Sequence, residues 1–172
     1  MNALLTRQLT MIVRSARVRR YHTEDTQQQQ NVGEHTYGVM WLVYVLTNGA
    51  CSKDLLLVAM MHDAPEYTTG DVPAPVKKQY GVKPVFDAME DELFESLHIP
   101  QPVISDTEAR TLKLADCLEG ALFCLSEAYR GNRLIEGCLA NYISYLDSMN
   151  PTDVALEILT HIKEHRDAIF RQ

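Results

Sequence analysis

The sequence predicts an all-α fold, a bundle of about six or seven helices formed by the whole chain, residues 1–172. Apolar residues recur at helical spacing from end to end, and no segment shows the sustained apolar–polar alternation of a strand. Signals that start and stop helices interrupt this pattern repeatedly. The length of 172 residues, with 46% hydrophobic and 23% charged residues, is typical of one globular domain.

The sequence of the N-terminal half predicts three helices. The first covers residues 3–18, and the polar stretch that follows, Thr23–Asn31, contains four consecutive glutamines and is expected to be a solvated loop. The second helix starts at Asn31 or Gly33 and stops at Asn48-Gly49. Ser52 can cap a third helix, residues 53–65, which is apolar almost all round and is therefore expected to be central.

The sequence of the C-terminal half predicts the remaining helices. A Gly- and Pro-rich segment, Thr68–Lys78, is expected to be a loop or a broken turn. Helices follow over residues 84–97, 106–130 and 133–148, and Ser105 with Glu108 forms a capping box for the second of these. The last helix is expected to open at Asn150-Pro151, an N-cap followed by a proline. The apolar faces of the last two helices suit either a core or an interface.

Charge and composition exclude several classes of function. A net charge of −7 argues against broad binding of nucleic acid, although a few local cations can still hold a small phosphate ligand. No apolar run is long enough to span a membrane, and the basic N-terminus lacks the apolar region of a signal peptide. The four cysteines contain no CxxC pair and require no oxidising compartment, so a cytoplasmic location is expected.

A candidate metal site begins at His62-Asp63, directly after the apolar run LLLVAMM. Two ionisable residues there are costly to bury unless they are paired. Adjacent helix positions point about 100° apart, so both can reach one ion only at a helix end or between helices. His35, at the head of the second helix, and Asp116, inside LKLADCLEGAL, supply further ligands. This N/O set suits one divalent transition metal, Zn, Co or Mn, with Fe or Ni as alternatives.

Each of these residues also has a purely structural interpretation. A lone His35 would more often bond to the backbone of its helix, and Asp116 could pair with Lys113 or Arg110. The dipeptide His62-Asp63 alone is a weak signal that occurs often by chance. The four residues in this order, each at a helix position that the others can share, favour the metal site.

The order of these residues is similar to the H…HD…D pattern of the HD-domain phosphohydrolases, and more closely to their YfbR-like 5'-deoxynucleotidase branch. That branch has a Glu-His pair, then HD followed by A-x-E, then T-G-D-x-P-x-P-V-K. This chain reads Glu34-His35, HDAPEYTTGDVPAPVK from His62 to Lys77, and KLAD from Lys113 to Asp116. The resemblance covers residues from about 14 to 125. It implies a single HD domain and a metal-dependent phosphoric ester hydrolase.

The resemblance also assigns roles to individual residues. His35, His62, Asp63 and Asp116 match the metal ligands. Glu66 matches the carboxylate that orients the attacking water, and Asp71 matches the acid near the ester oxygen. Arg20-Tyr21 matches an arginine–aromatic pair that would bind phosphate and stack on the base, although the family usually has tryptophan where Tyr21 stands.

Four cationic residues that can contact the substrate also have alternative roles. Arg20 can be a solvated member of the cluster with Arg17 and Arg19. Lys113 lies three residues before Asp116, so it can face phosphate or form a salt bridge with Asp116 or Glu119. Lys77 and Lys78 can reach a longer phosphate tail or lie in solvent.

Two enzymatic functions and one non-enzymatic function fit this pattern. The first is a 5'-nucleotidase acting on deoxynucleoside monophosphates. The second is a dNTP triphosphohydrolase, as in the similar short phage enzymes that act on dATP (the DatZ group), in which a second divalent ion can bind the phosphates. The third, a degenerate HD scaffold that only binds nucleotides, is disfavoured by the complete ligand set with Glu66 and Asp71. The resemblance further implies a homo-oligomer, a dimer or a hexamer, with a small deoxynucleotide as substrate.

Overall fold

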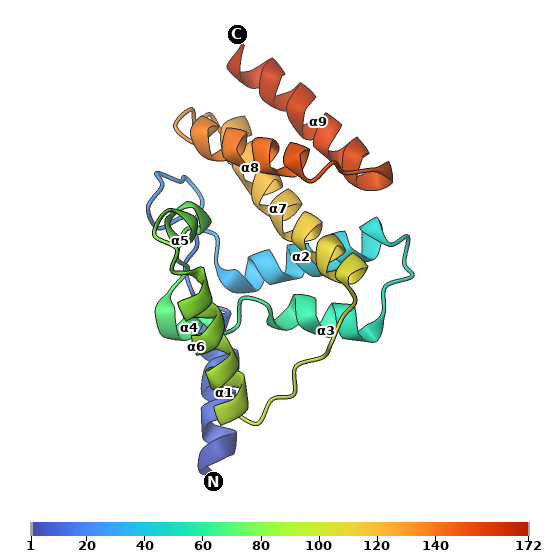
Figure 1. Ribbon diagram of the computed structural model, residues 1–172. Helices are drawn as coiled ribbons and strands as arrows, with labels where there is room; N and C mark the ends of the chain where they lie inside the picture. Colours follow the sequence, from blue (N-terminus) through green and yellow to red (C-terminus); the bar gives the residue numbers. More distant parts are fainter. Residues whose placement is uncertain (1, 172) are drawn as a thin grey trace.

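The computed structural model describes residues 2–171, so the two ends of the predicted domain, residues 1 and 172, lie outside the described residues. Within residues 2–171, nine helices follow one another, and the one β pairing is an isolated bridge between Arg19 and Asn31. The prediction of an all-α fold is confirmed. The helices are Ala3–Ser15 (α1), Val32–Leu46 (α2), Lys53–Met61 (α3), Glu66–Thr69 (α4), Ala74–Gln79 (α5), Lys83–Ser96 (α6), Asp106–Tyr129 (α7), Glu136–Ser148 (α8) and Asp153–Phe170 (α9), as Figure 1 shows.

Local capping signals explain where several helices begin. Asn31 caps α2 in a capping box with Glu34, which fixes the first turn of the helix that carries His35. Ser52 accepts a hydrogen bond from the N–H of Leu55 at the start of α3. The predicted capping box of Ser105 and Glu108 is present at the start of α7.

The start of the last helix was predicted wrongly. Helix α9 begins at Asp153 after Thr152, not at Asn150-Pro151. Asn150 has a φ of 47°, and its N–H bonds to the carbonyl of Asp147. It therefore belongs to the turn that ends α8, because a left-handed residue with that hydrogen bond cannot serve as an extended N-cap.

The segment after α3 contains more helix than predicted. The third helix ends at Met61 and not at residue 65. The short helix α4 overlaps the start of the Gly- and Pro-rich segment that was expected to be a loop, and α5 covers the end of that segment. Gly70, with a φ of 74°, separates them in a conformation that favours glycine. These two short helices account for the difference between the six or seven helices predicted and the nine observed within residues 2–171.

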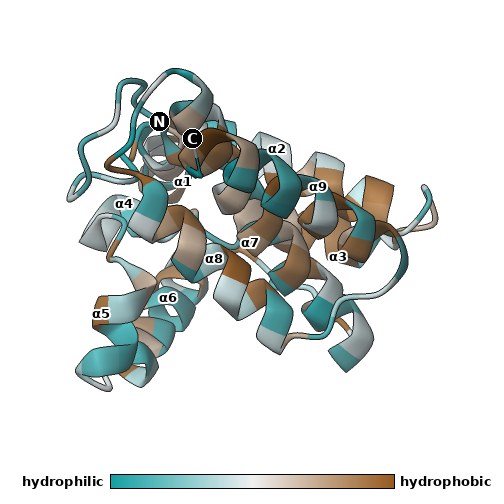
Figure 2. Ribbon diagram, turned by 90° about the horizontal axis from the view of Figure 1, so that it is seen from above, coloured by the Kyte–Doolittle hydropathy of each residue, from teal (hydrophilic) through white to brown (hydrophobic). Residues whose placement is uncertain are grey.

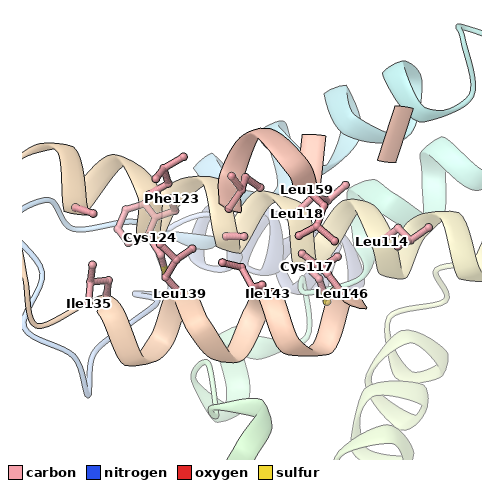
Figure 3. Close-up of a cluster of buried hydrophobic side chains, with 14 of the residues drawn as sticks. Leu114, Cys117, Leu118, Phe123, Cys124, Ile135, Leu139, Ile143, Leu146 and Leu159 are labelled. Atoms are coloured by element: carbon pink, nitrogen blue, oxygen red, sulfur yellow. The ribbon is translucent and has the colours of Figure 1, made fainter. Parts of the chain in front are cut away.

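Helix α7 lies at the centre of the bundle and packs against α2, α3, α8 and α9 (Figure 1). Figure 3 shows the side chains of α7 and α8 that meet in the largest buried cluster. Both Cys117 and Cys124 of α7 are buried in it. The expectation that residues 53–65 form the central helix is wrong, because α3 buries only Leu55 and Ala59 and leaves Met60 47% exposed.

The apolar faces of the last two helices contribute mainly to the core. Leu139 and Leu146 of α8 and Leu159 of α9 are completely buried against α7, whereas Leu134 and Leu156 are exposed. In Figure 2, hydrophobic residues gather around α7, and the region of α5 and α6 is mostly hydrophilic. Among the helices that the structure describes, none combines the length and the apolar character needed to cross a membrane.

Candidate metal centre

Donor atoms from three helices meet at one point. His35 lies in the first turn of α2, His62 forms the C-cap of α3, and Asp116 lies in the middle of α7. His35 is completely buried, and its Nε2 lies 3.3 Å from His62 Nε2 and 3.3 Å from Asp116 Oδ1. The three side chains offer ligand atoms that all lie within 4.8 Å of one another. This is a possible His/Asp metal site.

Asp63 joins this cluster from the turn after α3. Its Oδ2 lies 3.4 Å from Nε2 of both histidines, and it accepts a hydrogen bond of 3.0 Å from Arg20 Nη1. The α-helix ends just before this pair, which gives His62 and Asp63 the helix-end position that lets adjacent side chains approach one point. All four residues predicted as metal ligands are therefore brought together.

The spacing of the donors fits a four-coordinate ion. Ligands about 2.1 Å from a tetrahedral ion such as Zn²⁺ lie about 3.4 Å from one another. His35 Nε2 lies 3.3 to 3.4 Å from the other three donors. His62 Nδ1 lies 2.8 Å from the carbonyl of Ala59, which needs a proton on Nδ1 and leaves the Nε2 lone pair free. The chemistry of the donors, and the distances of the other three from His35, thus fit a transition metal.

The charges around the cluster favour a cation. Burial lowers the pKa of His35, but its bonds to Asp116 and Glu119 outweigh burial and raise the pKa to about 9. Burial opposes ionisation of Asp116, yet His35 and Lys113 hold the pKa of its carboxyl well below the usual range. Burial, together with the charge of Asp63, raises the pKa of Glu66 to about 9. A divalent cation among these groups would relieve the repulsion between the carboxylates.

Glu66 is the first residue of α4, and the charge of Asp63 contributes to its raised pKa, so it shares the electrostatic environment of the donors. It is 6% exposed, and its Oε2 has no hydrogen-bond partner among residues 2–171. A buried carboxylate oxygen without a partner in the protein can accept a hydrogen bond from a water molecule or a ligand. The charge of Asp71, one residue after Gly70, contributes to the raised pKa of both Glu66 and Arg20, so Asp71 shares this electrostatic environment.

The lysines predicted as phosphate contacts occupy different environments. Lys77 Nζ lies 3.9 Å from Glu66 Oε1 and 5.2 Å from the centre of the Phe86 ring. Lys78, in contrast, is exposed. Lys113 Nζ forms the predicted salt bridge with Asp116 Oδ2, at 2.7 Å, and remains 47% exposed, so it can still contact a ligand. Lys77 and Lys113 therefore both lie at the candidate site.

Arg20 and Tyr21 are both held by the protein. Arg20 is 7% exposed and is paired with Asp63, so it is not a solvated member of an arginine cluster. The Tyr21 ring stacks on Phe123 of α7 with centroids 4.6 Å apart, and its hydroxyl lies 3.1 Å from the Tyr142 hydroxyl. Tyr21 is partly buried against the core, and its role in stacking on a base stays a prediction.

The sequence interpretation missed three polar residues that are enclosed by the fold, two of which, Gln30 and Glu119, contact residues of the site. Gln30, expected in a solvated loop, is 5% exposed and contacts Arg20 and Glu119. Glu119 contacts His35 Nδ1. Glu127 is completely buried and accepts hydrogen bonds from the backbone N–H groups of Gln27 and Gln28. The spacing of three residues between Asp116 and Glu119 on one helix was the available signal for Glu119.

Comparison with known proteins identifies similar sequences. The model of the family "5'-deoxynucleotidase YfbR-like" matches residues 7–164. The 5'-deoxynucleotidase YfbR of Escherichia coli O127:H6 is 32% identical, over 60% of this chain and 63% of that protein. A 5'-deoxynucleotidase of Photorhabdus laumondii is 29% identical, over 60% of this chain and 64% of that protein. The chain therefore spans slightly less than two thirds of the length of these curated relatives.

Two solved structures share the fold. The PH0347 protein of Pyrococcus horikoshii OT3 has a TM-score of 0.65 and 20% identity, over 94% of this chain and 99% of that chain. The HD phosphohydrolase DatZ of cyanophage S-2L, solved with dA and one catalytic Zn²⁺ ion, has a TM-score of 0.63 and 20% identity. That match covers 95% of this chain and 96% of the phage protein. At this identity the two similarities show the fold alone.

Proposed function

The chain belongs to the YfbR-like 5'-deoxynucleotidase family, and we propose that it is a metal-dependent phosphohydrolase that cleaves the 5' phosphate ester of a deoxynucleotide. One observation carries this proposal: the donors of His35, His62 and Asp116 converge beside Glu66, whose buried Oε2 has no partner among residues 2–171. The proposed substrate is a deoxynucleoside monophosphate, and the products are a deoxynucleoside and inorganic phosphate.

The proposed cofactor is one divalent transition metal held by His35, His62, Asp63 and Asp116. Such an ion would polarise a phosphate oxygen and lower the pKa of a bound water molecule. Zinc is the first candidate because the donor set is N/O and the spacing suits a tetrahedral ion. The Zn²⁺ ion of the cyanophage enzyme supports the same choice. Cobalt and manganese are the next candidates.

The side chains around these donors suggest how the reaction is assisted. Glu66, with its available Oε2, would hold the attacking water and accept its proton. Asp71 would deliver a proton to the departing 5' oxygen, and its nearness to Glu66 and Arg20 supports this role. Lys113, paired with Asp116 yet half exposed, and Arg20, paired with Asp63, would neutralise charge that develops on the phosphate oxygens.

A dNTP triphosphohydrolase that releases triphosphate, for example from dATP, is the second candidate function. Lys77 favours it, because its ammonium group lies 3.9 Å from Glu66 and adds a cation next to the site for further phosphates. Attack at the α-phosphate would use the same metal, Glu66 and Asp71. The two functions therefore differ in the phosphate that leaves and not in the catalytic residues.

Product analysis distinguishes these functions. Purified protein loaded with Co²⁺ is incubated with each of the four dNMPs and dNTPs, and inorganic phosphate, triphosphate and free deoxynucleoside are quantified. We expect phosphate and deoxynucleoside in equal amounts from at least one dNMP. Equal amounts of triphosphate and deoxynucleoside from a dNTP would establish the second candidate instead. Turnover of no nucleotide would refute both.

A further inference from the structure

A chain of hydrogen bonds connects two of the proposed metal ligands through residues that are not ligands. Arg20 Nη1 donates to Asp63 Oδ2 at 3.0 Å, and Arg20 Nε donates to Gln30 Oε1 at 3.1 Å. Gln30 Nε2 in turn donates to Glu119 Oε1 at 2.7 Å, and Glu119 Oε2 contacts His35 Nδ1. His35 Nε2 lies 3.4 Å from Asp63 Oδ2, so the path closes on the metal cluster.

The direction of every hydrogen bond in this path follows from the arginine. A guanidinium group can only donate, so the Gln30 atom that faces it must be the carbonyl oxygen. The amide nitrogen of Gln30 must then face Glu119, whose carboxylate accepts at both oxygens. The remaining Glu119 oxygen needs a donor, so His35 carries its proton on Nδ1. The Nε2 lone pair of His35 is thereby directed at the ion that we propose.

Packing holds both middle residues of this path in position. A Cβ atom at Gly38 of α2 would lie 2.7 Å from Glu119 Cγ, so the glycine makes room for Glu119 between α2 and α7. Gln30 follows the backbone segment whose Gln27 and Gln28 N–H groups donate to the buried Glu127, further along α7. The loop that carries Gln30 is therefore fixed to the same helix that carries Glu119.

We propose that Gln30 and Glu119, which we call the Gln30–Glu119 bridge, are positioning residues of the metal centre. Glu119 holds His35 in the tautomer that binds metal, and Gln30 holds Arg20 against Asp63. This inference rests on the proposed function, because it presumes a metal ion at His35 and Asp63. Gln30 and Glu119 do not touch the substrate in this role; they act through His35 and Arg20.

Isosteric exchange of amide and carboxylate tests the bridge. In Glu119→Gln the new side chain has only one acceptor for the two donors, Gln30 Nε2 and His35 Nδ1, so its amide nitrogen meets a donor at Gln30 or forces His35 to give up its proton on Nδ1. In Gln30→Glu two carboxylates face each other. Each single variant should bind Co²⁺ about 10- to 100-fold more weakly than wild type, the usual cost of losing a group that orients a ligand. The double variant restores every donor–acceptor pair and should bind within about threefold of wild type.

The direction in which each single variant changes the Co²⁺ affinity distinguishes a role in orienting the ligands from a long-range effect of charge. Gln30→Glu adds a negative charge and Glu119→Gln removes one, so a purely electrostatic influence on a cation would change the affinity in opposite directions. The bridge predicts a loss in both single variants. A role in packing alone would give no loss in either single variant, since glutamine and glutamate have nearly the same shape.

The experiment measures the Co²⁺ dissociation constant by competition with a chelator. The absorption spectrum of bound Co²⁺ reports its coordination, and circular dichroism of the metal-free protein reports whether each variant is folded. Gln28→Glu, in the same glutamine run but with an exposed side chain, is the matched control and should bind as wild type does. The positioning role of Gln30 and Glu119 would be refuted if the single variants bound Co²⁺ normally. It would also be refuted if the double variant bound Co²⁺ as weakly as the weaker single variant. If the variants show this pattern of Co²⁺ affinities but the wild-type protein hydrolyses no nucleotide, the proposed function is refuted and the positioning role of Gln30 and Glu119 is retained.

Discussion

Replacement of Asp63 by asparagine is expected to lower kcat/KM for deoxynucleotide hydrolysis by about 1,000-fold or more, the equivalent of several kcal/mol of lost charge stabilisation by the metal. Asp63 Oδ2 lies 3.4 Å from Nε2 of both His35 and His62. A neutral amide at this position supplies a much weaker ligand than a carboxylate. The measurement is steady-state kinetics together with the metal content of the purified variant.

Two further variants make this result interpretable. Asp63 also pairs with the buried Arg20, so its loss can lower stability as well as metal binding. Asp116→Asn removes a carboxylate of the cluster without touching that ion pair and should give a similar loss of activity. Asp87→Asn removes an exposed carboxylate whose partner is Lys83 and should leave activity unchanged. Normal turnover in both Asp63→Asn and Asp116→Asn would contradict the assignment of the metal site.

Replacement of Glu66 by glutamine is expected to reduce kcat by roughly 100- to 10,000-fold, the usual contribution of a general base. The amide cannot accept a proton from the attacking water. Without a metal ion, burial and the charge of Asp63 raise the pKa of Glu66 to about 9, so a neutral amide of the same shape should be accommodated without loss of stability. A divalent cation bound next to it would lower this pKa, and the carboxylate could then accept the proton. Because Glu66 is not among the converging donors, the affinity for Co²⁺ should remain close to that of wild type.

Glu95→Gln, at an exposed position of α6, is the matched control for Glu66→Gln and should behave as wild type. The comparison of kcat with metal affinity separates a base from a ligand. A Glu66→Gln variant that turns over normally would exclude the role of Glu66 as a base. A variant that loses its metal together with its activity would instead make Glu66 a ligand.

Much of the fold could be predicted because its signals are local. Asn31 with Glu34 and Ser105 with Glu108 define helix starts within four residues, and both capping boxes are present. The meeting of His35, His62, Asp63 and Asp116 could be predicted for a different reason. Buried ionisable residues on apolar helices require partners, and the order of the four residues, together with the resemblance to the HD pattern, favoured a shared metal over separate structural pairings.

The features that the sequence did not reveal depend on tertiary contacts. Gln30 lies 89 residues from Glu119 along the chain, and no local pattern distinguishes it from its exposed neighbour Gln28. The stacking of Tyr21 on Phe123 of α7 could not be predicted either, because it requires the first loop to fold back on that helix. The central position of α7 likewise results from packing on several sides, which helical periodicity alone does not specify.

Removal and return of the metal tests the central claim most directly. The protein is stripped with a chelator, dialysed, and titrated with Zn²⁺, Co²⁺ or Mn²⁺ while release of deoxynucleoside from the best nucleotide substrate is followed. The account predicts that the stripped protein is folded and inactive, and that one equivalent of at least one of these ions restores activity. Asp63→Asn should not recover under the same titration. Full activity in the stripped protein, at a metal content near zero, would contradict the account.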